Sequence, residues 1–451
     1  MSISVQDIVI PTKWDIIPIH TSDRATFKFC RRQWDWSSPS RRNLVRKVKV
    51  HGVAMPLWFG TGIHYALASF YDPVLREDPE KVFESWFNTE WNGGIVHYSE
   101  LDYYADRDPV PASPYQTTDY DAMVVDEHTG ETVPAAWSVK GLSELLPNPD
   151  EELFMEHKAL GIGMMKYYKD YAERNDNFRV IVSEHTFSVP VLDPNGDVLY
   201  AEDHRKMPEW WKMDDLYGYF DTPVTTGGMF KQVHARGRQD TLLQDLETGQ
   251  YGILENKTTA RLDEDYFRHL ELDEQCTTYL WAAEREAEIY DLEYKNVDFI
   301  IYNALWKKYP RKPTILGSGK PSIDRQKEMT TARLFEDTMK ELGLTMLMQV
   351  DPKIKSYYEY LLEQGDKLFI QRGTPEMPYV TRNKAQKENA GKRLYYEAMD
   401  MLRTTDGYLY PNPQKDYLCL NCIFRAPCIQ AERGEDYEFT LADGYQENYD
   451  R

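Results

Sequence analysis

The chain has little of three features, and each shortage excludes a class of protein. It contains no run of eighteen apolar residues, so no membrane-spanning helix is expected. Its first segment, MSISVQDIVIPTKWD, lacks the basic and apolar regions of a signal peptide. Only five of its 451 residues are cysteines, which is too few for a disulfide scaffold. Together these shortages favour a cytoplasmic protein whose thiols stay reduced.

A phosphate-binding loop for a nucleotide is also missing. The segment GSGKPS, residues 317–322, comes nearest, but it lacks the G-x-x-x-x-G-K-[ST] spacing and has Pro321 where Ser or Thr is needed. We therefore expect no ATP-driven helicase within this chain. Any such motor, or a recombination protein, would be a separate partner.

The net charge of −21 argues against a protein that coats nucleic acid indiscriminately. Basic residues nevertheless gather in three stretches, residues 24–49, 307–312 and 382–393. The first stretch contains Trp34 and Trp36, and aromatic rings among cations are typical of proteins that bind single strands, where bases stack and phosphates pair. Each stretch is also compatible with an ordinary solvated surface.

Three of the cysteines form a C-x2-C-x5-C run late in the sequence, at Cys419, Cys422 and Cys428. Thiolates this close together suit zinc or an iron–sulfur cluster, and either group takes four ligands. Cys30 is the candidate for the fourth ligand, so one inorganic centre would join the start of the chain to its end. The spacing of the thiols does not distinguish zinc from iron and sulfur. Cys276 stands alone and is expected to pack as a small apolar side chain.

The order of predicted elements, a helix, then strands, then a helix, then a strand, indicates an α/β core. The predicted elements are helical pieces within 21–90 with a turn around 51–62, a helix at 151–173, strands at 178–191, 228–240 and 251–257, one long helix at 263–292, a strand at 297–305, and mostly helical structure at 325–405. We divide the chain into an N-terminal helical segment, 1–92; an acidic insertion, 93–150; a core, 151–309; a helical accessory region, 310–415; and a segment with the three cysteines and an acidic tail, 416–451.

Two carboxylates and a lysine form the strongest candidate for a chemical site. Asp240 and Glu255 are expected on neighbouring strands joined by the turn DLETGQ, and paired carboxylates suit Mg²⁺ or Mn²⁺. Lys257 follows Glu255 by two residues and so faces the same side of its strand. Such a cation can orient an attacking water and offset the charge of a phosphate. The spacing alone is weak evidence, because an exposed charged hairpin would look the same.

Four further residues are candidates for the same site. Gln275 and Tyr279 lie one helical turn apart on a common face. His64 follows Gly60 and Gly62, which we expect just before the start of a helix, and an imidazole can complete a carboxylate metal site. Glu184 lies in a predicted strand, where it faces either this site or solvent. Each has a purely structural alternative, since a lone histidine or tyrosine is more often part of the core.

The motifs GTGIH (Gly60–His64), GRQD (Gly237–Asp240), ENK (Glu255–Lys257) and QCTTY (Gln275–Tyr279), in this order, resemble those of the RecB-type nucleases of the PD-(D/E)xK superfamily. Many relatives carry Asp at the position of Glu255. The resemblance implies a restriction-endonuclease-like core, with a mixed sheet flanked by helices and with helical additions. It also implies that His64, Asp240, Glu255 and the carbonyl of Asn256 bind Mg²⁺ or Mn²⁺, that Lys257 is catalytic, and that Gln275 and Tyr279 position DNA.

The cysteine pattern is similar to that of a subset of this branch, the CRISPR-associated RecB-like exonucleases and the AddB nuclease domain. In that subset one cysteine before the core and three after it hold a 4Fe–4S cluster, which implies the same role for Cys30, Cys419, Cys422 and Cys428. The neighbours of Cys30 in the basic stretch, Arg31 and Arg32, are then candidates for binding DNA.

We therefore expect a metal-dependent DNA exonuclease that acts on single strands or DNA ends in recombination, repair or phage and CRISPR DNA processing. The alternative is a non-catalytic DNA-binding or assembly module that keeps the fold. Neither strand polarity nor the preference for single or double strands follows from the sequence.

Overall fold

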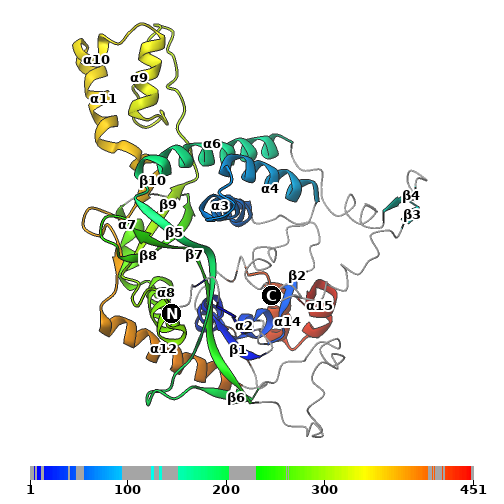
Figure 1. Ribbon diagram of the computed structural model, residues 1–451. Coiled ribbons are helices and arrows are strands. Elements are labelled where there is room, and N and C mark those ends of the chain that lie inside the picture. Colours follow the sequence, from blue (N-terminus) through cyan, green and yellow to red (C-terminus); the bar gives the residue numbers. More distant parts are fainter. Residues whose placement is uncertain are drawn as a thin grey trace.

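A mixed sheet of eight strands forms the centre of the molecule (Figure 1), as expected for the α/β class. The computed structural model describes residues 5, 8–11, 15–38, 41–46, 55–93, 123–125, 132–134, 151–202, 230–260, 262, 264–404, 409, 411, 419 and 422–447. Most of the expected acidic insertion at 93–150 lies outside these residues.

The main path of the sheet runs β1 (Ile16–His20), β7 (Phe230–Asp245), β8 (Tyr251–Thr259), β9 (Phe299–Trp306) and β10 (Ile370–Arg372). Strands β5 (Phe178–Pro190) and β6 (Tyr200–Glu202) also pair with β7, and β11 (Val380–Thr381) pairs with β9. The pairs β1–β7 and β8–β9 are parallel, and the other pairs are antiparallel. Two small antiparallel ladders stand apart, β2 (Leu44–Arg46) with β12 (Tyr445–Glu447) and β3 (Met123–Val125) with β4 (Thr132–Pro134).

Helices cover both faces of the sheet. One face packs against α3 (Met55–Tyr71), α4 (Pro79–Gly93) and α6 (Glu151–Asn175), and the other packs against α8 (Glu274–Tyr290), α12 (Lys384–Arg403) and α1 (Thr21–Phe29). Neighbouring residues of one strand therefore enter different cores, as Ile253 and Leu254 of β8 do. Burial on both faces explains why β8 and β9 read as nearly continuous apolar runs.

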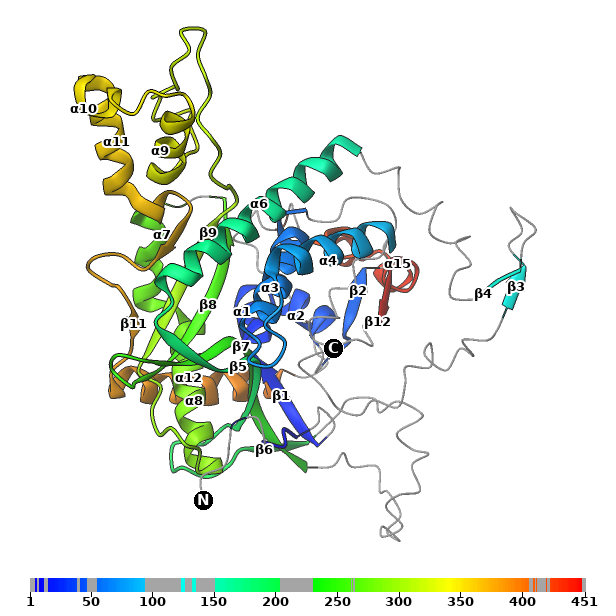
Figure 2. The ribbon, with the colours of Figure 1, turned by 45° about the horizontal axis from the view of Figure 1, so that its top comes forward.

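The remaining helices are short additions around this core. They are α2 (Arg31–Ser37), α7 (Glu264–Arg268) with the 3-10 turn His269–Leu272, α9 (Ala332–Glu341), α10 (Leu347–Val350), α11 (Pro352–Gln364) with the 3-10 turn Gly365–Leu368, α14 (Arg425–Arg433) and α15 (Tyr437–Gly444). Helices α9 to α11 pack around their own apolar cluster, which includes Phe335 and Tyr357, and they project beyond the end of the sheet in both views (Figures 1 and 2).

The predicted strands at 178–191, 251–257 and 297–305 are confirmed, and β7 extends past the predicted end at Asp240. The single long helix expected over 263–292 is wrong. Asp273 ends the first part of it, because its side chain accepts a hydrogen bond from the backbone N–H of Cys276 and so begins a new helix, α8. The region 325–405 is mostly helical, as expected, but it also supplies β10 and β11 to the sheet.

The glycines of the GTGIH motif do not precede a helix, as expected from the sequence, but lie inside α3. A side chain on Gly62 would place its Cβ 2.2 Å from the ring of Trp86, and one on Gly60 would lie 3.1 Å from Oγ1 of Thr258. These glycines therefore allow close packing of α3 against α4 and β8.

Segments from the two ends of the sequence lie side by side. β2 pairs with β12, and Trp36 packs on Phe424 with their ring centroids 5.5 Å apart. Arg42 forms an ion pair with Glu438 at 2.6 Å. These contacts, which we call the closure, hold the two ends of the chain together around the cysteine-containing segment.

Within the described part of the chain, no helix has the length and apolar character needed to cross a bilayer.

Candidate active site

Asp240 and Glu255 lie side by side on the antiparallel strands β7 and β8. Thr241 is paired with Leu254, so Asp240 and Glu255 occupy the next opposed positions of the register and point to the same face. The backbone N–H of Asn256 donates a hydrogen bond of 2.7 Å to Oδ2 of Asp240. The predicted convergence of the two carboxylates is therefore observed.

Lys257 and Gln275 both contact the carboxylate of Glu255. The ammonium group of Lys257 donates to Oε1, as the two-residue spacing along β8 predicts. The amide of Gln275, at the start of α8, donates to the same oxygen at 3.1 Å and to the hydroxyl of Tyr279 at 2.8 Å. Thus α8 brings its one-turn pair to the site, with Tyr279 buried beneath Gln275 against Phe187.

His64 reaches the site from the opposite helical layer. Its Nδ1 lies 3.5 Å from Oδ2 of Asp240. Although burial alone would lower the pKa of His64, the charge of Asp240 and its hydrogen bond raise the pKa above the ordinary value. Each of the four motifs therefore contributes at least one side chain to this place: His64, Asp240, Glu255, Lys257, Gln275 and Tyr279.

Glu184 also belongs to this cluster, an alternative that the sequence left open. It is a non-glycine residue with a left-handed backbone, φ 55°, in the middle of β5, and its carboxylate pairs with Nε of Arg238 at 2.8 Å. Residues held in such sparsely populated conformations concentrate at functional sites. Burial raises its pKa to about 7, while Arg238 lowers it and Asp240 raises it. No periodicity in the sequence reveals a left-handed residue within a strand.

Burial and the neighbouring charges shift the pKa values of the charged groups of the site in different directions. Burial, and then repulsion by Asp240, raise the pKa of Glu255 to about 7 despite the opposing effect of Lys257. Burial would also raise the pKa of Asp240, but His64, Lys257 and the Asn256 N–H outweigh it and lower the pKa to about 2. Burial opposes the charge of Lys257, yet Glu255 and Asp240 raise its pKa well above the usual range. Lys257 is therefore a cation at any physiological pH.

A buried polar network supports β8 from its other face. The amide of Asn303 on β9 donates to the side chain of Asn256 at 2.7 Å and to the hydroxyl of Tyr168 at 2.9 Å. Arg372 on β10 donates to Asn303 at 3.2 Å and forms an ion pair with Asp176 at 2.6 Å. This network holds the side chain of Asn256 on one face of β8. Because side chains alternate between the two faces of a strand, Glu255 and Lys257 then lie on the opposite face, toward the site. Sequence reasoning missed it, because its members come from four separated segments.

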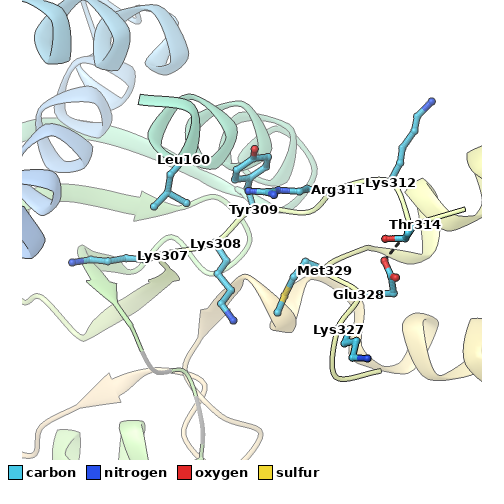
Figure 3. A pocket seen from close by; sticks show the side chains of 10 residues that line it. All are labelled: Leu160, Lys307, Lys308, Tyr309, Arg311, Lys312, Thr314, Lys327, Glu328 and Met329. Carbon is cyan, nitrogen blue, oxygen red and sulfur yellow. Dashed lines mark hydrogen bonds between the residues drawn. The ribbon is translucent and has the colours of Figure 1, made fainter. Parts of the chain in front are cut away.

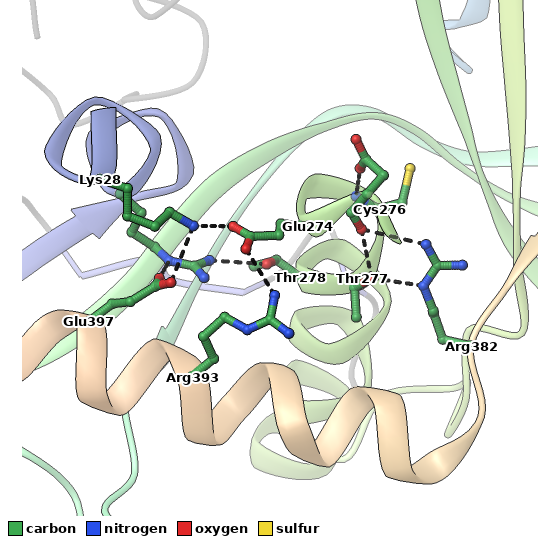
Figure 4. Close-up of polar contacts among 10 residues, drawn as sticks. Lys28, Glu274, Cys276, Thr277, Thr278, Arg382, Arg393 and Glu397 are labelled. Carbon is green, nitrogen blue, oxygen red and sulfur yellow. Dashed lines mark hydrogen bonds and ion pairs between the residues drawn. The ribbon is translucent and has the colours of Figure 1, made fainter. Parts of the chain in front are cut away.

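Polar contacts also hold α8 in place (Figure 4). Arg24 of α1 donates to Glu397 of α12 at 2.6 Å and to Thr278 of α8 at 3.1 Å. On the other side, Arg382 donates to the hydroxyl of Thr277 at 2.7 Å, as Figure 4 shows. It also donates to the carbonyl of Leu270 at 2.5 Å. The start of the helix that presents Gln275 is thus bound by α1 and by the segment that contains Arg382.

The donor atoms fit a hard divalent cation, although they are not arranged around one point. Among the described residues, no three His, Cys, Asp or Glu side chains are positioned to hold a metal ion. However, Oε2 of Glu255 is buried and has no hydrogen-bond partner within the same part of the chain. A buried carboxylate oxygen without a donor is costly, and a cation would offset that cost.

The four cysteines predicted to form an inorganic centre lie near one another without disulfides. Burial raises the pKa of Cys422, and the charges of the Cys30, Cys428 and Cys419 thiols raise it further. The guanidinium of Arg32 donates to Sγ of Cys428 at 3.4 Å. These thiols are neighbours, but in the described residues they do not surround a common point. Cys276 is buried in the core, as expected.

The two arginines beside Cys30 have different environments. Arg32 is 4% exposed and donates to the carbonyl of Leu409 at 2.9 Å, so its contacts are those of a residue that ties the cysteine segment to α2. Arg31 lies over the ring of Phe27 at 5.0 Å from the centroid. Contacts of either with DNA stay a prediction.

Comparison with known families agrees with this geometry. A family model described as the PD-(D/E)XK nuclease superfamily matches residues 21–429. The matched region extends from α1 to α14 and includes every residue of the site. No match is found among curated proteins.

Proposed function

The chain belongs to the PD-(D/E)XK nuclease superfamily, and we propose that it is a RecB-like, metal-dependent DNA exonuclease. The observation that carries this proposal is the meeting of Asp240, Glu255 and Lys257 on β7 and β8, with Oε2 of Glu255 buried and without a hydrogen-bond donor among the described residues. A protein that only binds DNA would not need a buried carboxylate oxygen that lacks a hydrogen-bond donor.

Asp240 and Glu255 would hold the divalent cation, with His64 and the carbonyl of Asn256 as further ligands. Bound Mg²⁺ or Mn²⁺ supplies Lewis-acid polarisation of the scissile phosphate and a lowered pKa for the attacking water. Lys257 keeps its positive charge beside that phosphate and stabilises the negative charge that develops on it. Gln275 donates to Glu255 and to Tyr279, and in this proposal it would orient Glu255 and the bound strand.

We further propose that Cys30, Cys419, Cys422 and Cys428 hold a structural 4Fe–4S cluster. Support comes from the gathering of four free thiols between α2 and α14. Burial raises the pKa of Cys428, and the guanidinium of Arg32, which donates to its Sγ, opposes that rise. The cluster would reinforce the closure that β2 and β12 already make.

A timed digest of end-labelled DNA tests the nuclease. Single- and double-stranded substrates are incubated with Mg²⁺ or Mn²⁺, and a covalently closed circle separates exonuclease from endonuclease action. The wild type should shorten the linear substrates, and Lys257→Ala should lower the rate by about 100-fold or more. Equal rates for the two proteins would contradict the proposal. DNA binding without cleavage by either protein would favour the non-catalytic module.

The absorption spectrum and metal content of anaerobically purified protein test the cluster. A 4Fe–4S protein is brown and absorbs broadly in the blue, with about four irons per chain. A colourless protein with one zinc would overturn the cluster while leaving the nuclease intact.

A further inference from the structure

A basic pocket of about 390 Å³ lies where the accessory helices leave the sheet (Figure 3). Among its lining residues are five cations and one carboxylate: Lys307, Lys308, Arg311, Lys312, Lys327 and Glu328. The carboxylate is engaged, because Oε2 of Glu328 accepts a hydrogen bond of 3.1 Å from the backbone N–H of Thr314. In a chain of net charge −21, such a local excess of cations needs an explanation.

Strand β9 links the pocket to the candidate active site along the chain. In the parallel register of β8 and β9, Lys257 pairs with Ala304 and Thr259 pairs with Trp306. The backbone N–H of Lys307 then donates to the carbonyl of Thr259 at 2.8 Å. The first cation of the pocket, Lys307, therefore directly follows β9, the strand that pairs with the one carrying Lys257.

Two of the cations, Lys308 and Arg311, have no acidic partner among the described residues. The ammonium of Lys308 lies 3.7 Å from the centroid of the Trp306 ring, and the guanidinium of Arg311 lies 4.7 Å from that of Tyr309. Rings hold cations in place without neutralising them. Burial lowers the pKa of Lys308, as expected where no anion compensates. By contrast, Lys312 pairs with Glu341 at 2.6 Å and Lys327 with Asp324 at 3.7 Å.

The arrangement suits an extended polyanion better than a single small anion. Figure 3 shows the cations spread along the segment, with Lys307 and Lys308 pointing in different directions, rather than converging on one point. Strands rise about 3.3 Å per residue, so Trp306, four positions past the partner of Glu255, lies roughly 13 Å along the sheet from that carboxylate. A stacked nucleic-acid strand covers that distance in about four nucleotides.

We propose that this pocket holds the phosphate backbone of the substrate strand about four nucleotides from the scissile bond, with Lys308 and Arg311 as its phosphate contacts. The inference rests on the proposed function and adds to it a path for the strand. It also gives the accessory helices α9 to α11 a role, since residues 327–329 at their base form the far wall of the pocket.

The test compares Lys308→Ala/Arg311→Ala with the matched control Lys353→Ala/Lys355→Ala. The control removes the same charge from α11 of the same accessory region, outside the pocket. Thermal unfolding first establishes that both variants are folded. Binding of fluorescein-labelled single-stranded oligonucleotides of about three and about fifteen nucleotides is then measured in EDTA at several salt concentrations.

For the longer oligonucleotide, the pocket variant should bind at least about tenfold more weakly than the control. The slope of log Kd against log salt should fall in magnitude by about 1.4, since each phosphate contact with a single strand contributes about 0.7. The loss should be much smaller for the short oligonucleotide, which does not span the distance. Equal binding by the pocket variant and the control, or an equal loss at both lengths, would overturn the inference.

Cleavage assays on the same proteins separate this inference from the proposed function. If the wild type cleaves DNA and the pocket variant behaves as the control does in binding, the nuclease stands and the strand path is wrong. If the wild type does not cleave but the pocket variant alone loses length-dependent binding, the path stands and the nuclease is wrong.

Discussion

At Glu255, burial and charge act together against ionisation. Its carboxylate is buried beside Asp240, which raises the pKa to about 7, and one of its oxygens has no hydrogen-bond partner in the described part of the chain. The free protein thus carries a cost at this residue that a bound cation offsets. Both the chemistry and its pH dependence follow from this one side chain.

We predict that affinity for Mg²⁺ rises about tenfold between about pH 6 and pH 8. Binding needs the carboxylate form of Glu255, which is a small fraction below its pKa of about 7 and predominates above it. Calorimetry in buffers of different ionisation enthalpy measures both the affinity and the proton released. An affinity that is the same at the two pH values, with no proton release, would contradict the raised pKa.

Gly62→Ala is predicted to destabilise the protein by about 1–3 kcal/mol, since the new Cβ would overlap the ring of Trp86 and force α3 away from α4. Because α3 also carries His64, cleavage should weaken as well. Gly317→Ala is the control, since its added Cβ would meet no atom within 4 Å. Thermal unfolding of both variants decides, and equal melting temperatures would refute the packing argument.

At the scale of the elements, β8 is held from both faces. Glu255 and Lys257 face the site, while Asn256 faces the network that runs through Asn303 to Arg372 and Asp176. The network on this face of β8 therefore ends in a partly buried ion pair to which β10 contributes Arg372, and β10 joins the sheet only after the accessory helices.

Arg372→Gln should lower the free energy of unfolding by about 1–3 kcal/mol, because it leaves the partly buried carboxylate of Asp176 without its cation. It should also reduce kcat below the melting temperature, with Arg372→Lys recovering part of the loss. Arg333→Gln removes an exposed ion pair with Asp170 and should cost about 0–1 kcal/mol. An Arg372→Gln protein as stable as the Arg333→Gln control would show that the network does not support β8.

The strands of the site could be predicted from the sequence, but the network and the edge of the sheet could not. Residues 178–190 and 251–259 carry local signals of β-structure, and the two-residue spacing of Glu255 and Lys257 gives their common face. The pairing of β1 with β7 joins segments more than two hundred residues apart and leaves no local pattern. Asp273 is a typical N-cap residue, but the apolar periodicity of residues 263–292 predicts one continuous helix across it.

At the scale of the whole molecule, two arginines of the basic stretch at residues 24–49 join the chain's two ends. Arg32 and Arg42 pair with Glu432 and Glu438 of the C-terminal helices. Composition showed the local excess of charge but not its partners, because the acids lie nearly four hundred residues away.

Replacing Cys422 and Cys428 together by Ser is predicted to loosen the closure and leave the central sheet folded. These side chains pack beside Trp36 and Phe424, so their loss, with that of any bound cluster, should lower the melting temperature and speed proteolytic release of α14 and α15. Circular dichroism should retain the signal of the sheet. Unchanged proteolysis relative to the wild type would show that the thiols do not maintain the closure.

The pairing of β2 with β12 has a consequence for synthesis of the protein. The two strands are separated by roughly 400 residues, which a ribosome translating about 5–20 residues per second covers in about 20–80 s. During that interval β2 has no partner, and Trp36 and Arg42 are exposed without the residues that later cover them. A prematurely terminated polypeptide would never acquire β12, so its N-terminal segment would remain open to chaperones and proteases until it was degraded.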